Sequence, residues 1–167
     1  GIAAQPLDRG FVVGSNATFS VTPSGTGPFS YGWQKDGTNL SNGGQISGAT
    51  SNILTIAAVT TNNEGSYSVI VTNPVGSVAS SNALLTVLFP AAFTSPTNAV
   101  GRQGGLFSFT NTANGTIPIY FGATNLPLGL SIEPTNGVIS GTPPVTGLFN
   151  VTLFATNAAM TTTGKLA

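Results

Sequence analysis

Short stretches of alternating apolar and polar residues, separated by turn-forming residues, most constrain how this 167-residue chain can fold. Alternation with a period of two places every second side chain on the same face of a strand. No window has apolar residues at sustained helical spacing. We therefore predict an all-β sandwich or barrel. The alternating stretches are 17–21, 29–33, 52–56, 66–71 and 83–87 in the first half, and 106–109, 117–121, 130–132, 138–140 and 149–155 in the second.

Turn-forming residues predict where these strands connect and where one domain gives way to the next. Asp36-Gly37 is a hairpin signal after the second stretch, and Asn136-Gly137 predicts a two-residue hairpin turn in the second half. Pro90 cannot continue a central ladder because it has no N–H to donate. We therefore expect two domains, residues 1–88 and 89–167, each about the size of one small sandwich.

The charge content excludes several classes of partner. Only 5% of residues are charged, against about 25% in an ordinary soluble domain. The four basic residues, Arg9, Lys35, Arg102 and Lys165, are scattered along the chain. Nucleic acids and anionic membrane surfaces require clustered basic residues, so we expect neither as a partner. The longest nearly apolar stretch, residues 83–93, is too short to cross a bilayer, so no membrane insertion is expected.

The residue types that most catalytic sites need are missing or dispersed. The chain has no Cys and no His, which excludes thiol nucleophiles, Ser-His triads, Cys or His zinc sites and haem ligation by these residues. Its four acids are Asp8, Asp36, Glu64 and Glu133. Glycoside hydrolysis needs two carboxyl groups about 5–10 Å apart, whereas these acids lie in separate turns or in different domains. We expect no enzyme activity, no cofactor and no metal.

Trp33 and Tyr67 stand in two of the alternating stretches of the first half, and with this pattern residues 10–87 resemble an I-set-like immunoglobulin domain. Trp33 falls where that family keeps its core tryptophan, and Tyr67 falls at its tyrosine corner. Val21 and Val69 occupy the two positions that the family joins by a disulfide between sheets. The resemblance implies a disulfide-free sandwich, of a kind more similar to bacterial tandem surface modules than to animal receptor ectodomains. The matching stretches are 14–21, 31–37, 51–56 and 63–69.

Two glycine-containing motifs, at 126–130 and 139–143, mark the second half, and with them residues 91–167 resemble the bacterial putative-immunoglobulin, cadherin-like family. The resemblance rests on leucine-proline-x-glycine-leucine at 126–130, isoleucine-serine-glycine-threonine-proline at 139–143, and residues 147–157. Together, the two resemblances imply two tandem Greek-key immunoglobulin-like β-sandwiches. Some cadherin-like relatives bind Ca²⁺ through clustered carboxylates. Here Glu133 is the one acid after Glu64, so no calcium site is expected.

The aromatic residues divide into expected core residues and candidates for contact with a partner. Phe154 follows the inward-pointing Leu153, so alternation predicts that it points outward. Phe89 lies in the hinge, where packing between the modules is the alternative, and Phe121 has the alternative of a covered core edge. The expected core aromatics are Trp33, Tyr67, Phe107, Phe109 and Phe149, and the candidate interface residues are Phe11, Phe89, Phe121 and Phe154.

The last strand of the second domain is predicted to be about three residues shorter than that of the first. Residues 80–87 form a full final strand, whereas residues 162–167 match only its beginning. An incomplete strand exposes ladder groups and apolar surface, which makes Leu166 and Ala167 further interface candidates. A following module could complete the sheet in cis, or a neighbouring subunit could add a strand. The opening Gly1-Ile-Ala-Ala, without Met or a signal sequence, is expected of a piece cut from a longer tandem protein.

These observations favour a non-catalytic structural or adhesive module of a secreted or cell-surface bacterial protein, as a repeat in an extracellular fibre or stalk. The expected partners are neighbouring modules or further copies of the chain. The alternative is an accessory or spacer module of a large secreted enzyme that binds carbohydrate through exposed aromatics on one face. The two hypotheses differ in whether glycans bind and whether the native protein assembles.

Overall fold

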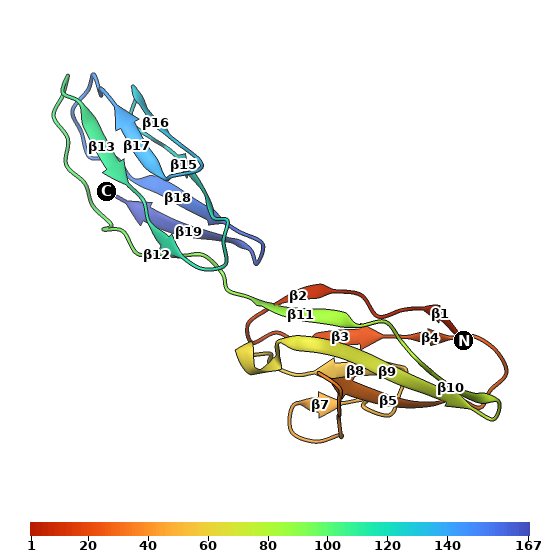
Figure 1. The fold of residues 1–167 in the computed structure, drawn as a ribbon. Helices are drawn as coiled ribbons and strands as arrows, with labels where there is room; N and C mark the ends of the chain where they lie inside the picture. The colour runs from red at the N-terminus through yellow and green to blue at the C-terminus, as the bar shows by residue number, and fades with distance from the viewer. The chain divides into compact units, whose positions relative to one another are not determined.

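The computed structural model describes residues 1–167, which divide into two compact units, Gly1–Val87 and Leu88–Ala167 (Figure 1). All regular elements are strands except one 3-10 turn, η1 (Thr61–Asn63). Each unit packs two principal sheets against each other around its own core. The prediction of an all-β fold made of two sandwiches is confirmed.

The first unit has two principal sheets, in which antiparallel strand pairs predominate. The smaller sheet has the order β3 (Ala17–Ser20), β8 (Ile53–Ile56), β7 (Ile46–Ser47). The larger has the order β2 (Arg9–Val12), β11 (Ala83–Leu88), β9 (Gly65–Asn73), β5 (Ser30–Lys35), β6 (Thr38–Asn39), with β10 (Gly76–Ala79) also paired to β9. A short pair joins β1 (Ile2–Ala4) to β4 (Thr22–Pro23).

The core of the first unit contains thirteen buried hydrophobic residues. Trp33 is fully buried, pairs across the sheet with Val69, and donates its indole N–H to the Ser51 carbonyl at 2.8 Å. Val21 and Val69 are 1% and 0% exposed. Two buried valine side chains therefore stand at the positions that cysteines hold in related domains. The expected core roles of Trp33, Val21 and Val69 are confirmed.

The predicted tyrosine corner is present in the first unit. The Tyr67 hydroxyl donates a hydrogen bond to the Asn63 carbonyl at 2.7 Å, while the ring stacks on Phe19 with centroids 5.0 Å apart. Burial raises the pKa of the Tyr67 phenol to about 12, with a smaller contribution from the Asp36 carboxylate. The corner thus fixes the turn before β9 to the strand itself.

The second unit also has two principal sheets, each of three antiparallel strands. One has the order β13 (Phe107–Thr110), β17 (Val138–Gly141), β16 (Leu130–Ile132), and the other β15 (Tyr120–Thr124), β18 (Val151–Thr156), β19 (Thr161–Leu166). A short pair joins β12 (Ala92–Phe93) to β14 (Ala113–Asn114).

The core of the second unit is smaller. Its buried cluster consists of Ile139, Val151, Leu153 and Leu166. Phe107 and Phe109 pack against this cluster while remaining partly exposed, so their expected core role holds in a weaker form. Phe149 was expected in the core but is half-buried on the wall of a pocket described below.

Each unit contains its own asparagine clamp, in which one asparagine side chain holds a turn. The asparagine lies at the turn after β9 in the first unit and at the turn after β18 in the second. The Asn73 amide donates to the Thr26 carbonyl at 2.9 Å, and its Oδ1 accepts the N–H groups of the turn. Asn157 does the same in the second unit, donating to the Thr116 carbonyl at 2.9 Å. The central strand pairs of the two units correspond when the two asparagines are aligned. Val69, four residues before Asn73, pairs with Trp33 in the first unit. Leu153, four residues before Asn157, pairs with Ala123 in the second.

The two glycine motifs of the second unit meet where β16 and β17 pair. Thr142 donates its N–H to the Gly129 carbonyl at 3.2 Å, and Leu130 pairs with Gly141. A Cβ at Gly141, whose φ is +144°, would overlap the Gly129 carbonyl oxygen. A close crossing of two backbones therefore accounts for glycine at both positions.

Two local predictions for the second unit are wrong. The turn containing Asn136-Gly137 has four residues, because Glu133 donates its N–H to the Val138 carbonyl and residues 134–137 close the loop. Pro134 lacks an N–H, while Asn136 Oδ1 accepts the Val138 N–H at 3.0 Å and holds the wider turn. The strand expected at 117–121 begins at Tyr120, after Pro118. The Asp36-Gly37 turn is confirmed, with Gln34 and Lys35 paired to Asn39 and Thr38.

Candidate functional site

The four carboxylates all bind nearby N–H or hydroxyl groups of the chain. Asp8 Oδ1 accepts the Leu84 N–H at 2.7 Å, Asp36 Oδ1 the Ser66 N–H at 2.8 Å, and Glu64 Oε1 the Val87 N–H at 2.8 Å. Glu133 Oε1 accepts the Thr135 hydroxyl at 3.2 Å. Three of the four acids therefore fasten one strand of the first unit to another part of it, and the fourth holds a turn.

Two of the four aromatic interface candidates cover the cores of their own units. Phe11 packs on the first core, with its ring edge-on to Phe19 at a centroid distance of 6.1 Å. Phe121 pairs with the buried Ala155 and therefore points to the same, inner side of its sheet. Its ring lies 6.5 Å from that of Phe93. Phe121 therefore lies at a covered edge of the core, which was the alternative to its role as an interface residue.

Phe89 is the most open of the four, with 41% of its surface exposed. Its backbone is fixed within the second unit. The Phe89 carbonyl accepts the Thr116 N–H at 3.0 Å and the Asn157 amide at 2.8 Å, and its N–H donates to the Thr116 hydroxyl. The side chain is therefore presented from an anchored position.

Phe154 points outward, as alternation predicts, because Leu153 and Ala155 on either side are buried. It is half-buried since it leans over Gly122, its partner on β15, where a Cβ would lie 3.7 Å from the Phe154 Cβ. On its other side it pairs with Thr163. Tyr120, 52% exposed, stands at a diagonal position on the same outer face. Sequence reasoning missed Tyr120 because it put the strand too early.

The outer face of the β15–β18–β19 sheet thus carries aromatic and hydroxyl side chains in three rows, each row running across the three strands. One row is Tyr120, Thr156 and Thr161, in which the two threonine hydroxyls lie 2.9 Å apart. The middle row is Gly122, Phe154 and Thr163, and the third is Thr124, Thr152 and Lys165. A sheet face with two rings and several hydroxyls can stack on and hydrogen-bond to a neutral polar ligand.

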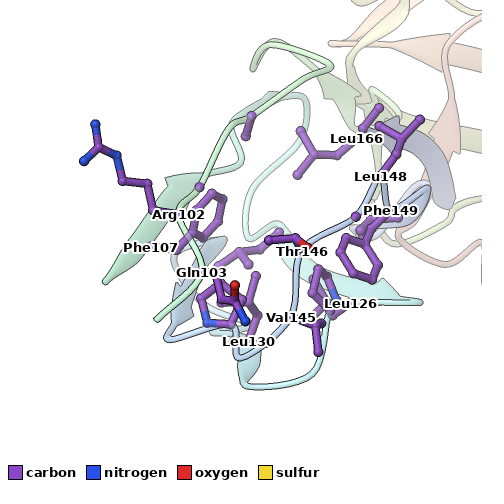
Figure 2. A pocket seen from close by; sticks show the side chains of 18 residues that line it. Arg102, Gln103, Phe107, Leu126, Leu130, Val145, Thr146, Leu148, Phe149 and Leu166 are labelled. Atoms are coloured by element: carbon purple, nitrogen blue, oxygen red, sulfur yellow. The ribbon is translucent and has the colours of Figure 1, made fainter. Parts of the chain in front are cut away.

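An apolar pocket of about 330 Å³ opens at the other end of the second unit from Asn157 (Figure 2). Phe107, Leu126, Leu130 and Phe149 line it, and the Arg102 side chain extends away from it. The surrounding loops also carry strongly exposed apolar side chains: Val100, Leu106, Leu128 and Leu148 are 93%, 95%, 73% and 81% exposed. No single sequence pattern predicts this pocket, since four separated segments line it.

Leu166 and Ala167 lie at this pocket. Leu166 is 5% exposed and belongs to the core cluster, so its expected exposure is wrong; its side chain packs against the unit's own interior. Ala167 is exposed and exchanges two backbone hydrogen bonds with Thr97 and Ala99, both at 2.9 Å. β19 pairs with β18 as far as Val151, and residues 147–150 pair with no strand.

Comparison with protein families gives one match for each unit. Residues 2–87 match the immunoglobulin I-set domain, and residues 90–166 match a domain described as a putative Ig domain. The curated proteins contain no match to the chain. No helix of the structure has the length and hydrophobicity needed to cross a membrane.

Several solved structures of consecutive immunoglobulin domains are similar to the chain. The I-band fragment I67–I69 of titin has a TM-score of 0.77 and 20% identity, over 99% of this chain and 63% of that one. Extracellular domains 3–5 of Drosophila OTK give 0.72 and 17%, over 99% and 60%. Sidekick-1 immunoglobulin domains 1–5 give 0.68 and 19%, over 99% and 38%. The chain thus spans less than two thirds of these structures, and at this identity the likeness shows the fold alone.

Proposed function

Because the chain belongs to the immunoglobulin I-set family through its first unit and adds a second immunoglobulin-like unit, we propose that it is a non-catalytic structural or adhesive module. The observation that carries the proposal is the series arrangement of two units, each with its own core and its own asparagine clamp. The hydrogen bonds of the four carboxylates are consistent with it, because each carboxylate holds a strand or a turn of its own unit.

We further propose that the module belongs to a secreted or cell-surface bacterial protein and is a repeat of an extracellular fibre or stalk. Its surface has few charges, and hydroxyl and amide groups supply most of its polarity. Rigid sandwiches in series would space other domains, and neighbouring modules or further copies would be the partners.

Light scattering and negative-stain microscopy of the native protein test the fibre proposal. Elongated multimers or extended arrays are the expected result. Native material that is strictly monomeric and unattached to any larger structure would contradict it, while leaving the fold assignment intact.

A second function, binding of a neutral carbohydrate, is favoured by the outer face of β15, β18 and β19. Tyr120 and Phe154 provide two neighbouring rings on that face, and Thr124, Thr152 and Thr163 provide hydroxyl groups beside them. Sugar rings bind through apolar stacking on aromatics combined with hydrogen bonds to hydroxyls.

Glycan-array binding separates the two functions. If the face binds carbohydrate, Tyr120→Ala and Phe154→Ala should each abolish the signal. The matched control is Ile70→Ala, since Ile70 pairs with Gly32 on β5 of the first unit as Phe154 pairs with Gly122. A blank array with the unaltered chain excludes the carbohydrate function for the glycans displayed.

A further inference from the structure

The chain contains three Asn-Gly dipeptides, at residues 42–43, 114–115 and 136–137. In such a pair the backbone nitrogen of the glycine can attack Cγ of the asparagine and close a succinimide ring, because glycine has no Cβ to obstruct the approach. All three asparagines are exposed, so access of solvent does not distinguish them. The difference lies in whether hydrogen bonds hold the attacking nitrogen and the asparagine amide.

In the connection between β6 and β7, hydrogen bonds hold both reacting groups of Asn42-Gly43. The Gly43 N–H donates to the Ile46 carbonyl at 2.9 Å, and the Gly43 carbonyl accepts the Ile46 N–H at 3.0 Å. Asn42 Oδ1 accepts the Ala49 N–H at 2.8 Å. A glycine nitrogen engaged in this way cannot lose its proton and attack the side chain until its hydrogen bond breaks.

The turn between β16 and β17 holds Asn136-Gly137 in the same way. The Gly137 N–H donates to the Glu133 carbonyl at 2.9 Å, and Asn136 Oδ1 accepts the Val138 N–H at 3.0 Å. Gly137 is also buried. The fold therefore protects this dipeptide too, although the Asn136 side chain is exposed.

At Asn114-Gly115, at the end of β14, both reacting groups are unengaged. The Asn114 side chain makes no hydrogen bond, and the Gly115 N–H has no acceptor. Asn114 pairs with Ala92, and the next N–H is directed away from β12, as at alternate residues of an antiparallel ladder. The fold also requires glycine here, because a Cβ on Gly115, whose φ is +147°, would lie 2.8 Å from the Pro90 carbonyl oxygen.

We propose that Asn114-Gly115 is a self-modification site, at which the folded chain converts Asn114 to aspartate and isoaspartate. The Gly115 nitrogen loses its proton and bonds to Asn114 Cγ; the Cγ–Nδ2 bond breaks, and the leaving amide group takes up a proton and departs as ammonia. Water then opens the succinimide. Addition at Cγ gives aspartate, and addition at the main-chain carbonyl gives isoaspartate. The net reaction consumes one water and releases one ammonia.

The product alters the place where the backbone of Phe89 is anchored. Thr116, two residues after Asn114, donates its N–H to the Phe89 carbonyl at 3.0 Å, and its hydroxyl accepts the Phe89 N–H at 2.7 Å. Isoaspartate adds a methylene group to the main chain just before Thr116, so these two bonds loosen. The reaction also adds a negative charge to a chain whose formal net charge is zero. This inference depends on neither the fibre nor the carbohydrate proposal.

The first test follows the three dipeptides in the unaltered chain, folded and in denaturant. The chain is incubated at mildly alkaline pH, where amide protons are lost faster, and peptide mapping by mass spectrometry measures each conversion. We expect Asn114 to react about tenfold faster than Asn42 and Asn136 in the folded chain. The three rates should become similar in denaturant, since only the folded chain holds the other two dipeptides. Conversion of Asn42 or Asn136 as fast as that of Asn114 in the folded chain would overturn the proposal.

The second test measures the effect on the anchor. The isoaspartate form is isolated by ion exchange, and amide hydrogen exchange at Phe89 and Thr116 is compared with that of two freshly prepared variants. Asn114→Gln keeps an uncharged amide on a longer side chain, and Asn114→Asp adds the charge without the extra methylene. We expect about tenfold faster exchange in the isoaspartate form and no change in either variant. Unchanged protection in the isoaspartate form, or an equal loss in Asn114→Asp, would contradict the proposed effect on Phe89.

Discussion

The two units build the same asparagine clamp and the same central pair of strands, yet their cores differ greatly. In the first, Trp33, the Tyr67 corner and the end of β11 fill one continuous core of thirteen buried residues. In the second, Ala123 stands at the position that corresponds to Trp33, and the core cluster has four buried residues with an apolar pocket beside them. The difference shows that the asparagine clamp and the central strand pairing are common to both units, while the large side chains of the first unit give it the larger buried core.

The largest expected effect comes from removing the tryptophan that distinguishes the first core. Trp33→Ala should destabilise the first unit by about 3–5 kcal/mol, because it removes a fully buried ring and leaves a cavity. Phe149→Ala in the second unit should cost less than half as much, since that ring already borders open space. Denaturant unfolding followed by circular dichroism measures both. Similar costs would mean that the second core is as tightly packed as the first.

A disulfide between the sheets would sharpen the contrast further. Val21→Cys combined with Val69→Cys should form the bond that the matching family has at these positions and stabilise the first unit by about 2–4 kcal/mol. The second unit should be unaffected. Unfolding with and without reductant gives the difference, and thiol titration establishes whether the bond has formed; free thiols under oxidising conditions would show that the two positions are wrongly aligned.

The paired glycines of the second unit let two backbone segments approach closely where β16 and β17 pair. Gly141→Ala should destabilise the second unit by more than about 1 kcal/mol, because the residue has a positive φ and faces the Gly129 carbonyl. Gly104→Ala is the matched control, since Gly104 also has a positive φ but open space around its Cβ position. If the two variants lost equal stability, φ alone and not the crossing would explain the motif.

The tyrosine corner should make the stability of the first unit depend on pH. The pKa of Tyr67 is raised to about 12 from its ordinary value of 10, so folding favours the protonated phenol. The resulting stability is complete below pH 10 and is lost as the pH rises towards 12. Tyr67→Phe should cost about 1 kcal/mol at neutral pH through loss of the bond to Asn63, and should flatten this loss at high pH. An unchanged pH profile in the variant would assign it to other groups.

The sequence predicted the features that depend on a few neighbouring residues. Trp33, the Tyr67 corner, the Asp36-Gly37 turn and the outward direction of Phe154 all follow from local spacing. The inward direction of Phe121 required the pairing register, because the strand starts later than its apolar pattern suggests. The pocket required the whole fold, since loops far apart in the sequence form its walls.

Amide hydrogen exchange of the unaltered chain tests the contrast between the units most directly. The two segments to compare are residues 65–67, which pair with β11, and residues 147–150, which pair with no strand. The account predicts that amides bonded in the β9–β11 ladder exchange only on global unfolding of the first unit, while residues 147–150 exchange close to the unprotected rate. Comparable protection of the two segments would contradict it, because it would mean that the second sandwich is closed at this end.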